Sequence, residues 1–222
     1  MKAFIVILLF MIAFWTYVEI SNRNSKSMTT RQKILKAVYP LWVWYADKRG
    51  LNTKRLSDEK TVPLISFYSL KDTLNNGTVF DFEQLRGKKI MLVNTASDCG
   101  YTRQYDGLQK LSEQYKNEIM VIGFPANDFK EEEKGTDKEI AEFCRINFGV
   151  SFPLMKKSSV IKGPGQNKVF AWLTDPAKNG WNKKQPSWNF CKYIISEDGR
   201  LTHFFGSTIE PMSKEILSVL NH

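Results

Sequence analysis

The stretch KIMLVNTASDCGYTRQYDGLQKLSEQYKNEIMVIGFPA, residues Lys89–Ala126, decides the fold. Its first part, Lys89–Ser97, is a continuous apolar run of the kind that forms a strand buried on both faces. The next part, Arg103–Asn117, has apolar side chains at helical spacing, and Ile119–Ala126 is a second apolar run. A strand, a helix and a second strand predict a βαβ unit, and therefore an α/β domain.

The sequence on both sides of this unit carries further strand and helix patterns. Leu64–Leu70 and Gly77–Lys89 are predicted to be strands joined by an NNG turn. Thr136–Phe148 is predicted to be a helix that begins with a capping box of Thr136 and Glu139. The last predicted elements are two strands joined by a turn and a closing helix, at residues 189–196, 201–206 and 213–221.

The amino terminus is an apolar segment, Ala3–Val18, which contains no charge. It predicts a helix for a lipid environment, although it is somewhat shorter than the roughly 20 residues that span a bilayer core. A cleaved signal peptide is therefore the alternative. Large side chains between Trp15 and Ile20 occupy the place of a small-residue cleavage site, and no cysteine offers a lipidation site. We expect residues 1–22 to be an uncleaved membrane anchor.

A basic segment follows, and we expect residues 23–60 to form a juxtamembrane region and linker. Its positive charges favour a cytoplasmic position for the soluble part; they are Arg23, Lys26, Arg31, Lys33 and Lys36. Ile34–Gly50 reads as an amphipathic helix at the membrane interface that Pro40 kinks or interrupts, with Trp42 and Trp44 at the headgroup level. Packing of this helix on the domain is the alternative. Leu51–Val62 is polar and reads as a linker.

Composition and charge exclude several classes of protein. The chain has 222 residues and a formal net charge of +9, but its basic residues are spread along the sequence without an aromatic-basic cluster, so we expect no nucleic-acid binding. Three cysteines without a CxxC pair encode neither a zinc site nor a disulfide framework. The only histidines are His203 and His222, so a Cys-His catalytic pair would depend on His203, which lies in a strand-like segment.

Cys99 follows the first strand of the βαβ unit and precedes its helix. Parallel α/β sheets present reactive groups at this position. The amide groups at the start of a helix stabilise an anion, so a thiol there would have a lowered pKa and would be a better nucleophile at neutral pH. From this position alone, a structural cysteine is equally compatible.

The residues around Cys99 resemble the first signature of the glutathione peroxidase family, VNxASxCGxTxQY, at Val93, Asn94, Ala96, Ser97, Cys99, Gly100, Thr102, Gln104 and Tyr105. GFPANDF at Gly123–Phe129 resembles the second signature, and WNF at Trp188–Phe190 resembles the third. The resemblance runs from Leu64 to Leu220. It implies that residues 61–222 form a thioredoxin-like fold, a central mixed sheet flanked by helices. It also implies a thiol peroxidase that reduces hydrogen peroxide and organic or lipid hydroperoxides without a metal or organic cofactor.

The resemblance also implies roles for individual residues. Cys99 occupies the position of the peroxidatic residue, and Trp188 and Asn189 occupy those of two donors to its thiolate. Glu132 stands where many members have glutamine, and Lys134 stands where they have proline. An ionised carboxylate would raise the cysteine pKa, so we expect slower thiolate formation than with glutamine. Glu132 acting as a base, or swinging out in favour of Asn127 and the backbone, are the alternatives.

Cys144 coincides with the resolving cysteine of the thioredoxin-dependent branch of this family, and thioredoxin is the expected reductant, with glutathione second. A Cys99–Cys144 disulfide would then require local unwinding of the helix. The alternative is that Cys144 is a small buried residue on an apolar face with Ile140 and Phe143. Cys191 is expected to be structural. The short stretch before the WNF motif lacks the longer insertion of tetrameric members, so we expect a monomer.

Two other functions compete with the peroxidase. A peroxide sensor would pass its oxidation to a protein partner with negligible turnover, and the replacement of glutamine by Glu132 keeps this reading open. A disulfide reductase is disfavoured because that chemistry uses a CxxC pair, which this chain lacks.

Overall fold

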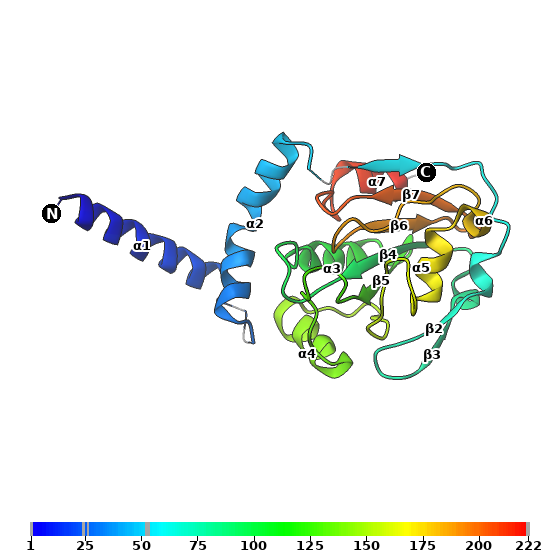
Figure 1. Cartoon of the computed structure of the whole chain (residues 1–222), viewed down its shortest axis with the longest axis horizontal. Helices are drawn as coiled ribbons and strands as arrows, with labels where there is room; N and C mark the ends of the chain where they lie inside the picture. The colour runs from blue at the N-terminus through cyan, green and yellow to red at the C-terminus, as the bar shows by residue number, and fades with distance from the viewer. Residues whose placement is uncertain (1, 24, 26, 52–53, 221–222) are drawn as a thin grey trace.

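The computed structural model describes residues 2–23, 25, 27–51 and 54–220. Figure 1 shows two apolar or amphipathic helices leading into a domain built on a mixed sheet. The five strands of the sheet lie in the order β1-β7-β6-β4-β5. Their bounds are Arg55–Ser57 (β1), Lys89–Thr95 (β4), Ile119–Pro125 (β5), Lys192–Ile195 (β6) and Leu201–Phe205 (β7). β4 and β5 are parallel, and the other neighbours are antiparallel.

The predicted βαβ unit is confirmed: β4 leads through α3 (Gln104–Gln114) into β5, with Lys89 opposite Ile119 and Thr95 opposite Pro125. All seven residues of β4 are buried, because the strand lies between β6 and β5 and is covered on both faces. Alternate side chains of a strand point to opposite faces. β4 therefore contributes to two apolar cores at once.

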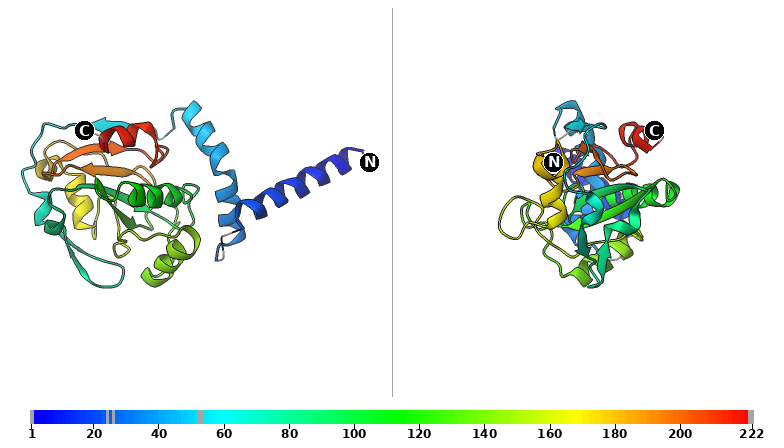
Figure 2. Two further views of the ribbon diagram at one scale, coloured as in Figure 1. Left: turned by 180° about the vertical axis from the view of Figure 1, so that it is seen from behind. Right: turned by 90° about the vertical axis from the view of Figure 1, so that its right-hand side faces the viewer.

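The two cores lie on opposite faces of the sheet. Figure 2 shows helices on both sides of the sheet. Met91 and Val93 face a core that includes residues of α3, of α4 (Asp137–Phe148) and of α7 (Lys214–Leu220). Ile90 and Leu92 face a core that includes residues of α5 (Lys168–Leu173). The chain also forms a short helix α6, Pro176–Asn179.

The capping box predicted for α4 is confirmed. The Glu139 backbone N–H donates to Thr136 Oγ1 at 3.3 Å, and the Thr136 backbone N–H donates to Glu139 Oε2 at 2.7 Å. Gly149 ends the helix in the left-handed conformation with φ of 64°, which glycine adopts without steric cost. These local signals start and stop the helix that carries Cys144. The closing helix α7 is also confirmed, although Asn221 of its predicted range lies outside the described residues.

Two local predictions were wrong. The predicted strand at Leu64–Leu70 is instead an irregular segment with a 3₁₀ turn, Phe67–Ser69, because Phe67 and Tyr68 turn into the core rather than pairing with a strand. The hairpin follows it as β2 (Lys71–Thr73) and β3 (Val79–Asp81), and the second 3₁₀ turn is Phe82–Leu85. The predicted linker contains β1, which pairs with β7 and covers the edge of the sheet.

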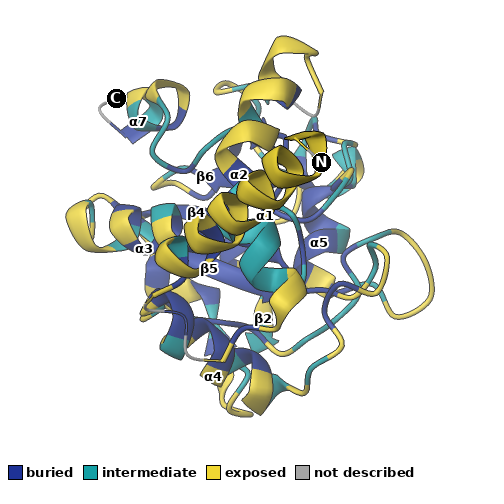
Figure 3. Ribbon diagram, turned by 90° about the vertical axis from the view of Figure 1, so that its left-hand side faces the viewer, coloured by how far each residue is buried: buried dark blue, intermediate teal, exposed yellow. Residues whose placement is uncertain are grey.

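The two N-terminal helices differ in how they contact the domain. α1 (Lys2–Ser21) projects away from it and is almost entirely exposed, as Figures 1 and 3 show. By length and apolar composition, α1 is able to cross a membrane. α2 (Thr30–Lys48) continues through Pro40, so of the predicted kink or interruption there the interruption was wrong. Ala37, Tyr39 and Ala46 of α2 are buried, which favours the alternative in which this helix packs on the domain.

A buried lysine joins the sheet to the loop after β7. Lys192 on β6 is fully buried, and its ammonium group donates to Gln104 Oε1 and to the Ile209 carbonyl at 2.5 Å. Gln104 in turn donates to the Ser207 carbonyl at 2.6 Å. Burial lowers the pKa of Lys192 from 10.5 to about 7, although the nearby Glu210 acts in the opposite direction. The sequence pattern does not show that Lys192 is buried, because a polar side chain at this strand position is equally typical of a surface.

We expect Lys192→Met to remove part of the pH dependence of stability. Between about pH 7 and pH 10.5 the unfolded chain binds the Lys192 proton and the folded chain does not. The free energy of unfolding therefore gains a component that rises with pH, at up to about 1.4 kcal/mol per pH unit. Denaturant unfolding at pH 7.5 and pH 9.5 measures it. The exposed Lys138→Met is the matched control, and an equal pH dependence in the parent and in Lys192→Met would contradict the prediction.

Candidate active site

Cys99 lies in a tight loop between β4 and α3. The Cys99 backbone N–H donates to Thr102 Oγ1 at 3.0 Å, and the Thr102 hydroxyl donates to the Ala96 carbonyl at 2.9 Å. The Tyr101 backbone N–H donates to Cys99 Sγ at 3.4 Å. The expectation that amides at the helix start stabilise the sulfur was wrong in detail, because α3 begins only at Gln104. The amide that reaches the sulfur belongs to the loop.

The structure brings Cys99 together with Glu132, Trp188 and Asn189. The side chains of Glu132 and Trp188 lie near enough to Cys99 to act on the pKa of its thiol, the first raising it and the second lowering it. The Asn189 side-chain amide donates to Glu132 Oε2 at 3.0 Å. All four side chains therefore form one connected group, but the Asn189 amide group donates to the carboxylate and not to the sulfur.

Asn94, at the end of β4, holds the WNF motif in place. Its side-chain amide donates to the Trp188 carbonyl at 2.9 Å and accepts from the Cys191 backbone N–H at 3.0 Å. The Asn94 backbone carbonyl accepts from the Phe190 backbone N–H at 2.6 Å. Phe190 has φ of 65°, an uncommon value for a residue other than glycine. Three hydrogen bonds from one buried residue thus fix the turn that presents Trp188 and Asn189.

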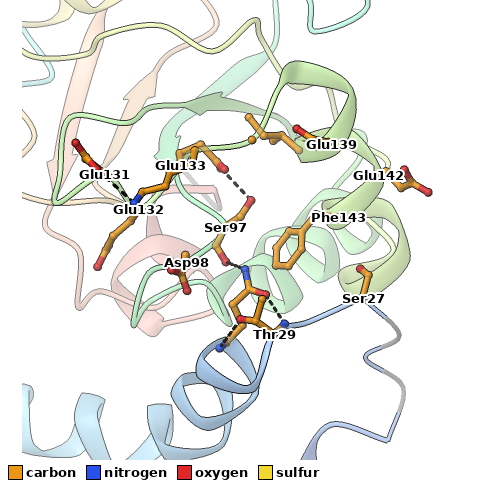
Figure 4. Close-up of a pocket in the computed structure, with 14 residues that line it drawn as sticks. Ser27, Thr29, Ser97, Asp98, Glu131, Glu132, Glu133, Glu139, Glu142 and Phe143 are labelled. Carbon is orange, nitrogen blue, oxygen red and sulfur yellow. Dashed lines mark hydrogen bonds and ion pairs between the residues drawn. The ribbon is translucent and has the colours of Figure 1, made fainter.

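A second loop positions Glu132, and Figure 4 shows it beside the Cys99 loop. Lys130 and Glu131 both have positive φ, and they reverse the chain just before Glu132. The Asp98 backbone N–H donates to the Glu132 carbonyl at 2.9 Å. Asn127 accepts from the Glu133 backbone N–H at 2.8 Å, so its side chain supports this loop rather than the sulfur.

Burial and charge oppose ionisation of Cys99 in this conformation. Burial raises the pKa of the Cys99 thiol well above its ordinary value, and the Glu132 carboxylate raises it further. The Tyr101 amide and the Trp188 indole act in the opposite direction, but they are outweighed. Cys99 is only 2% exposed. The arrangement agrees with the expectation that a carboxylate at position 132 disfavours the thiolate.

Glu133 is a second carboxyl group beside this site that the sequence analysis missed. The Ser97 hydroxyl donates to Glu133 Oε2 at 3.0 Å, and burial raises the Glu133 pKa to about 7. Burial raises the pKa of Cys144 and of Tyr105, and the Glu133 charge adds to this effect. The run of three glutamates at residues 131–133 was the available signal, but it does not tell which of them are buried.

Helix α2 supplies further residues that sequence reasoning did not place at the site. Arg31 forms an ion pair with the Asp98 carboxylate and donates to the Asp98 carbonyl at 2.9 Å. Another nitrogen of its guanidinium group lies 3.9 Å from Glu132 Oε1. Gln32 donates to the Ser97 carbonyl at 3.1 Å. The basic residues of this segment signalled membrane topology in the sequence, and nothing in their pattern indicates an ion pair with a distant loop.

The other predicted residues lie apart from this group. Cys144 is fully buried on α4 in the same apolar core as Cys99, and burial raises its pKa to about 12. Cys191 is buried with its sulfur 3.5 Å from Ser207 Oγ, and all three cysteines are free thiols. His203 lies on β7 with its Nε2 atom 3.4 Å from Glu59 Oε1. His222 lies outside the described residues.

Two cavities adjoin Glu132. A cavity of about 300 Å³ is lined by Trp42, Gly100, Tyr101, Glu132 and Trp188. A larger one of about 600 Å³, drawn in Figure 4, lies between the start of α2, the two site loops and α4, and six of its lining residues are carboxylates. Among the described residues, no three His, Cys, Asp or Glu side chains are grouped so as to hold a metal ion.

Comparison with known proteins relates the chain to one family. Residues 67–174 match the family model described as glutathione peroxidase. The chain is 38% identical over 159 residues to glutathione peroxidase-like peroxiredoxin 2 of Saccharomyces cerevisiae, a match that covers 70% of this chain and 98% of that protein. It is 41% identical over 147 residues to the glutathione peroxidase homolog BsaA of Staphylococcus epidermidis, which covers 66% and 92% of the two chains.

Solved structures confirm the thioredoxin-like fold. The crystal structure titled T. cruzi GPX1 aligns with a TM-score of 0.52 and 26% identity, covering 70% of this chain and 97% of that one. A DsbF homologue from Corynebacterium diphtheriae aligns with a TM-score of 0.53 over 75% of this chain and 91% of that one. At 16% identity, the second match shows a shared fold alone.

We expect Glu132→Gln to lower the pKa of the Cys99 thiol by about one unit or more, because it removes a like charge and supplies an amide donor. Alkylation rate against pH, in a background with Cys144→Ser and Cys191→Ser, measures that pKa. Glu131→Gln removes a neighbouring exposed carboxylate and is the matched control. A midpoint that stays in place or moves to higher pH in Glu132→Gln would refute the assigned effect of Glu132.

Proposed function

The chain belongs to the glutathione peroxidase family and is a hydroperoxide-reducing oxidoreductase, and from this premise we propose that Cys99 is its peroxidatic residue. One observation carries the proposal: the loop that follows β4 holds Cys99 where Glu132, which raises the pKa of its thiol, and Trp188, which lowers it, both act on the sulfur. An indole N–H donates and does not accept, so it stabilises the thiolate and not the thiol. A cysteine with only a structural role does not require a carboxylate such as Glu132 beside it.

The proposed first step is a two-electron oxidation of Cys99. Glu132 takes the thiol proton, and the sulfur attacks the distal oxygen of the hydroperoxide. The O–O bond breaks, a sulfenic acid forms on Cys99, and the leaving alkoxide or hydroxide takes the proton from Glu132. Glu132 is assigned this role because it is the carboxylate that acts on the pKa of the Cys99 thiol. Asn189 and Arg31 act on Glu132, since one donates to its carboxylate and the other lies 3.9 Å from it.

The proposed second step uses Cys144 as the resolving residue. Its sulfur attacks the Cys99 sulfenic acid, water leaves, and a disulfide forms that a dithiol reductant returns to two thiols. Both sulfurs are buried in one apolar core, which supports the pairing. A disulfide requires Cα atoms within roughly 7 Å and an accessible bond for its reductant, so part of α4 must open during the cycle. Cys191 takes no part in this scheme.

We favour thioredoxin over glutathione as the reductant. The cavity beside Glu132 is lined by six carboxylates and by Lys134 as its basic residue. Glutathione carries two carboxylates and one ammonium group at neutral pH, so like charges oppose its approach to the Cys99 loop. Peroxiredoxin names among the relatives also support a protein dithiol. We propose that the enzyme acts as a monomer.

We also propose that α1 anchors the enzyme to a membrane. α1 has 20 residues and is exposed along almost its whole length, which water does not favour for apolar side chains. In this proposal residues 1–22 form the anchor, residues 23–60 the juxtamembrane segment and residues 61–222 the catalytic domain. The basic residues that follow α1 favour the cytoplasmic side for this domain.

The catalytic assignment predicts a pattern among three substitutions. With purified full-length protein in detergent, hydroperoxide, thioredoxin and thioredoxin reductase, Cys99→Ser and Cys144→Ser should both abolish steady-state NADPH consumption. Cys191→Ser is the matched control and should keep the parent rate. Continued turnover of Cys144→Ser with thioredoxin would refute the resolving role. A parent protein that is oxidised once and cycles with neither thioredoxin nor glutathione would instead be the peroxide sensor.

The anchor predicts two properties of the protein in membranes. The mature chain should retain residues 1–22 in its intact mass, and it should stay in the pellet after alkaline carbonate extraction. A variant with Ile7→Arg and Leu9→Arg should be released, because charges in the bilayer core cost several kcal/mol. Loss of the N-terminal segment from the mature mass would show a cleaved signal peptide and would contradict the anchor.

A further inference from the structure

Helix α2 is held against the catalytic loop along its length. At its start, Arg31 pairs with Asp98 and Gln32 donates to the Ser97 carbonyl. Near its middle, the Tyr39 hydroxyl donates to Glu210 Oε1 at 2.5 Å. The Tyr39 ring meets the Tyr101 ring edge to face, with centroids 6.1 Å apart. These contacts place one face of α2 over the loop that carries Cys99.

This position makes Trp42 of α2 part of the lining of a cavity beside the loop that carries Cys99. The cavity of about 300 Å³ is lined by Trp42 on one side and by Gly100, Tyr101, Glu132 and Trp188 on the other. Gly100 and Tyr101 follow Cys99 directly in this loop, and Glu132 and Trp188 are the side chains that act on the Cys99 pKa. A molecule in this cavity therefore lies against the loop that carries Cys99 and in contact with Trp42. The Trp42 and Tyr101 rings are 6.4 Å apart and meet edge to face.

The chemistry of the lining selects the occupant. Three of the five lining residues are aromatic, and the one charged group among them is the Glu132 carboxylate. Aromatic walls stabilise an apolar group, whereas a carboxylate disfavours an anionic ligand. Hydrogen peroxide has no apolar group that would contact Trp42. The cavity suits a neutral hydroperoxide with an alkyl or aryl group.

We propose that Trp42 is a specificity-determining residue. It holds the apolar group of a neutral organic hydroperoxide against Tyr101 and Trp188, so that the O–O bond faces Cys99. The juxtamembrane helix thus completes the substrate site. This inference rests on the proposed role of Cys99, and it adds a residue outside the segment that matches the family model, since α2 precedes residue 67.

A single-turnover experiment on the full-length protein in detergent tests the proposal without any reductant. Consumption of one equivalent of cumene hydroperoxide, tert-butyl hydroperoxide or hydrogen peroxide is followed in the parent, Trp42→Ala, Trp42→Phe and Trp44→Ala proteins. We expect Trp42→Ala to lower the second-order rate constant for cumene hydroperoxide about tenfold, which is typical for loss of an apolar contact in a substrate pocket. The tert-butyl compound should show a smaller loss, and hydrogen peroxide less than a twofold change.

The other variants separate a substrate contact from a general disturbance. Trp42→Phe keeps an aromatic wall and should recover most of the rate with cumene hydroperoxide. Trp44 is exposed, lies under the Lys48 ammonium group and does not line the cavity, so Trp44→Ala should match the parent. Thermal unfolding of each variant checks that the fold is retained.

Three results would overturn the inference. Equal losses for all three hydroperoxides would mean that Trp42 acts on Cys99 or on the fold. An unchanged rate for cumene hydroperoxide in Trp42→Ala would mean that the apolar group does not contact Trp42. A parent protein whose Cys99 reacts with none of the three compounds would overturn the proposed function itself, and the specificity assignment with it.

Discussion

The site depends on one buried amide, that of Asn94. The Asn94 side chain donates to the Trp188 carbonyl and accepts from the Cys191 backbone N–H. The Asn94 backbone carbonyl accepts a third hydrogen bond, from the Phe190 backbone N–H. Asn94 is fully buried, so water cannot replace these partners, and an unpaired polar group there would be costly. The central strand and the turn of Trp188 and Asn189 are therefore joined as one unit. The geometry at Cys99 follows from that junction.

Within this frame, the electrostatics at Cys99 are set by a carboxylate and not by an amide. Glu132 holds the Asn189 amide group, so the carboxylate draws a donor away from the sulfur as well as placing a like charge beside it. Arg31 of α2 lies close enough to offset part of that charge, although its side chain is more than half exposed and solvent screens the interaction. A segment outside the conserved signatures thus takes part in the charge balance of the site.

Much of the fold and of the site was predictable from the sequence because local patterns decided it. The buried run of β4, the helical spacing of α3 and the capping box at Thr136 specify their elements over a few residues. The roles of β1 and α2 were not predictable in the same way. Arg55–Ser57 carries no strand pattern, since an edge strand is defined by its pairing with β7. Arg31 and Trp42 read as membrane-facing residues, because their partners at Asp98 and Tyr101 are distant in sequence.

The hydrogen bonds that join α1 to α2 affect how a hydroperoxide reaches the site. The Tyr17 hydroxyl donates to the Ala37 carbonyl at 3.1 Å, and the Asn22 amide donates to the Lys33 carbonyl at 2.9 Å. These bonds connect α1 to the same helix that forms a wall of the cavity. If α1 is the membrane anchor proposed above, these bonds hold the domain closer to the membrane surface than a long flexible linker would. A hydroperoxide dissolved in a bilayer around α1 would reach the cavity by lateral diffusion, at the effective concentration of the membrane rather than that of the surrounding water.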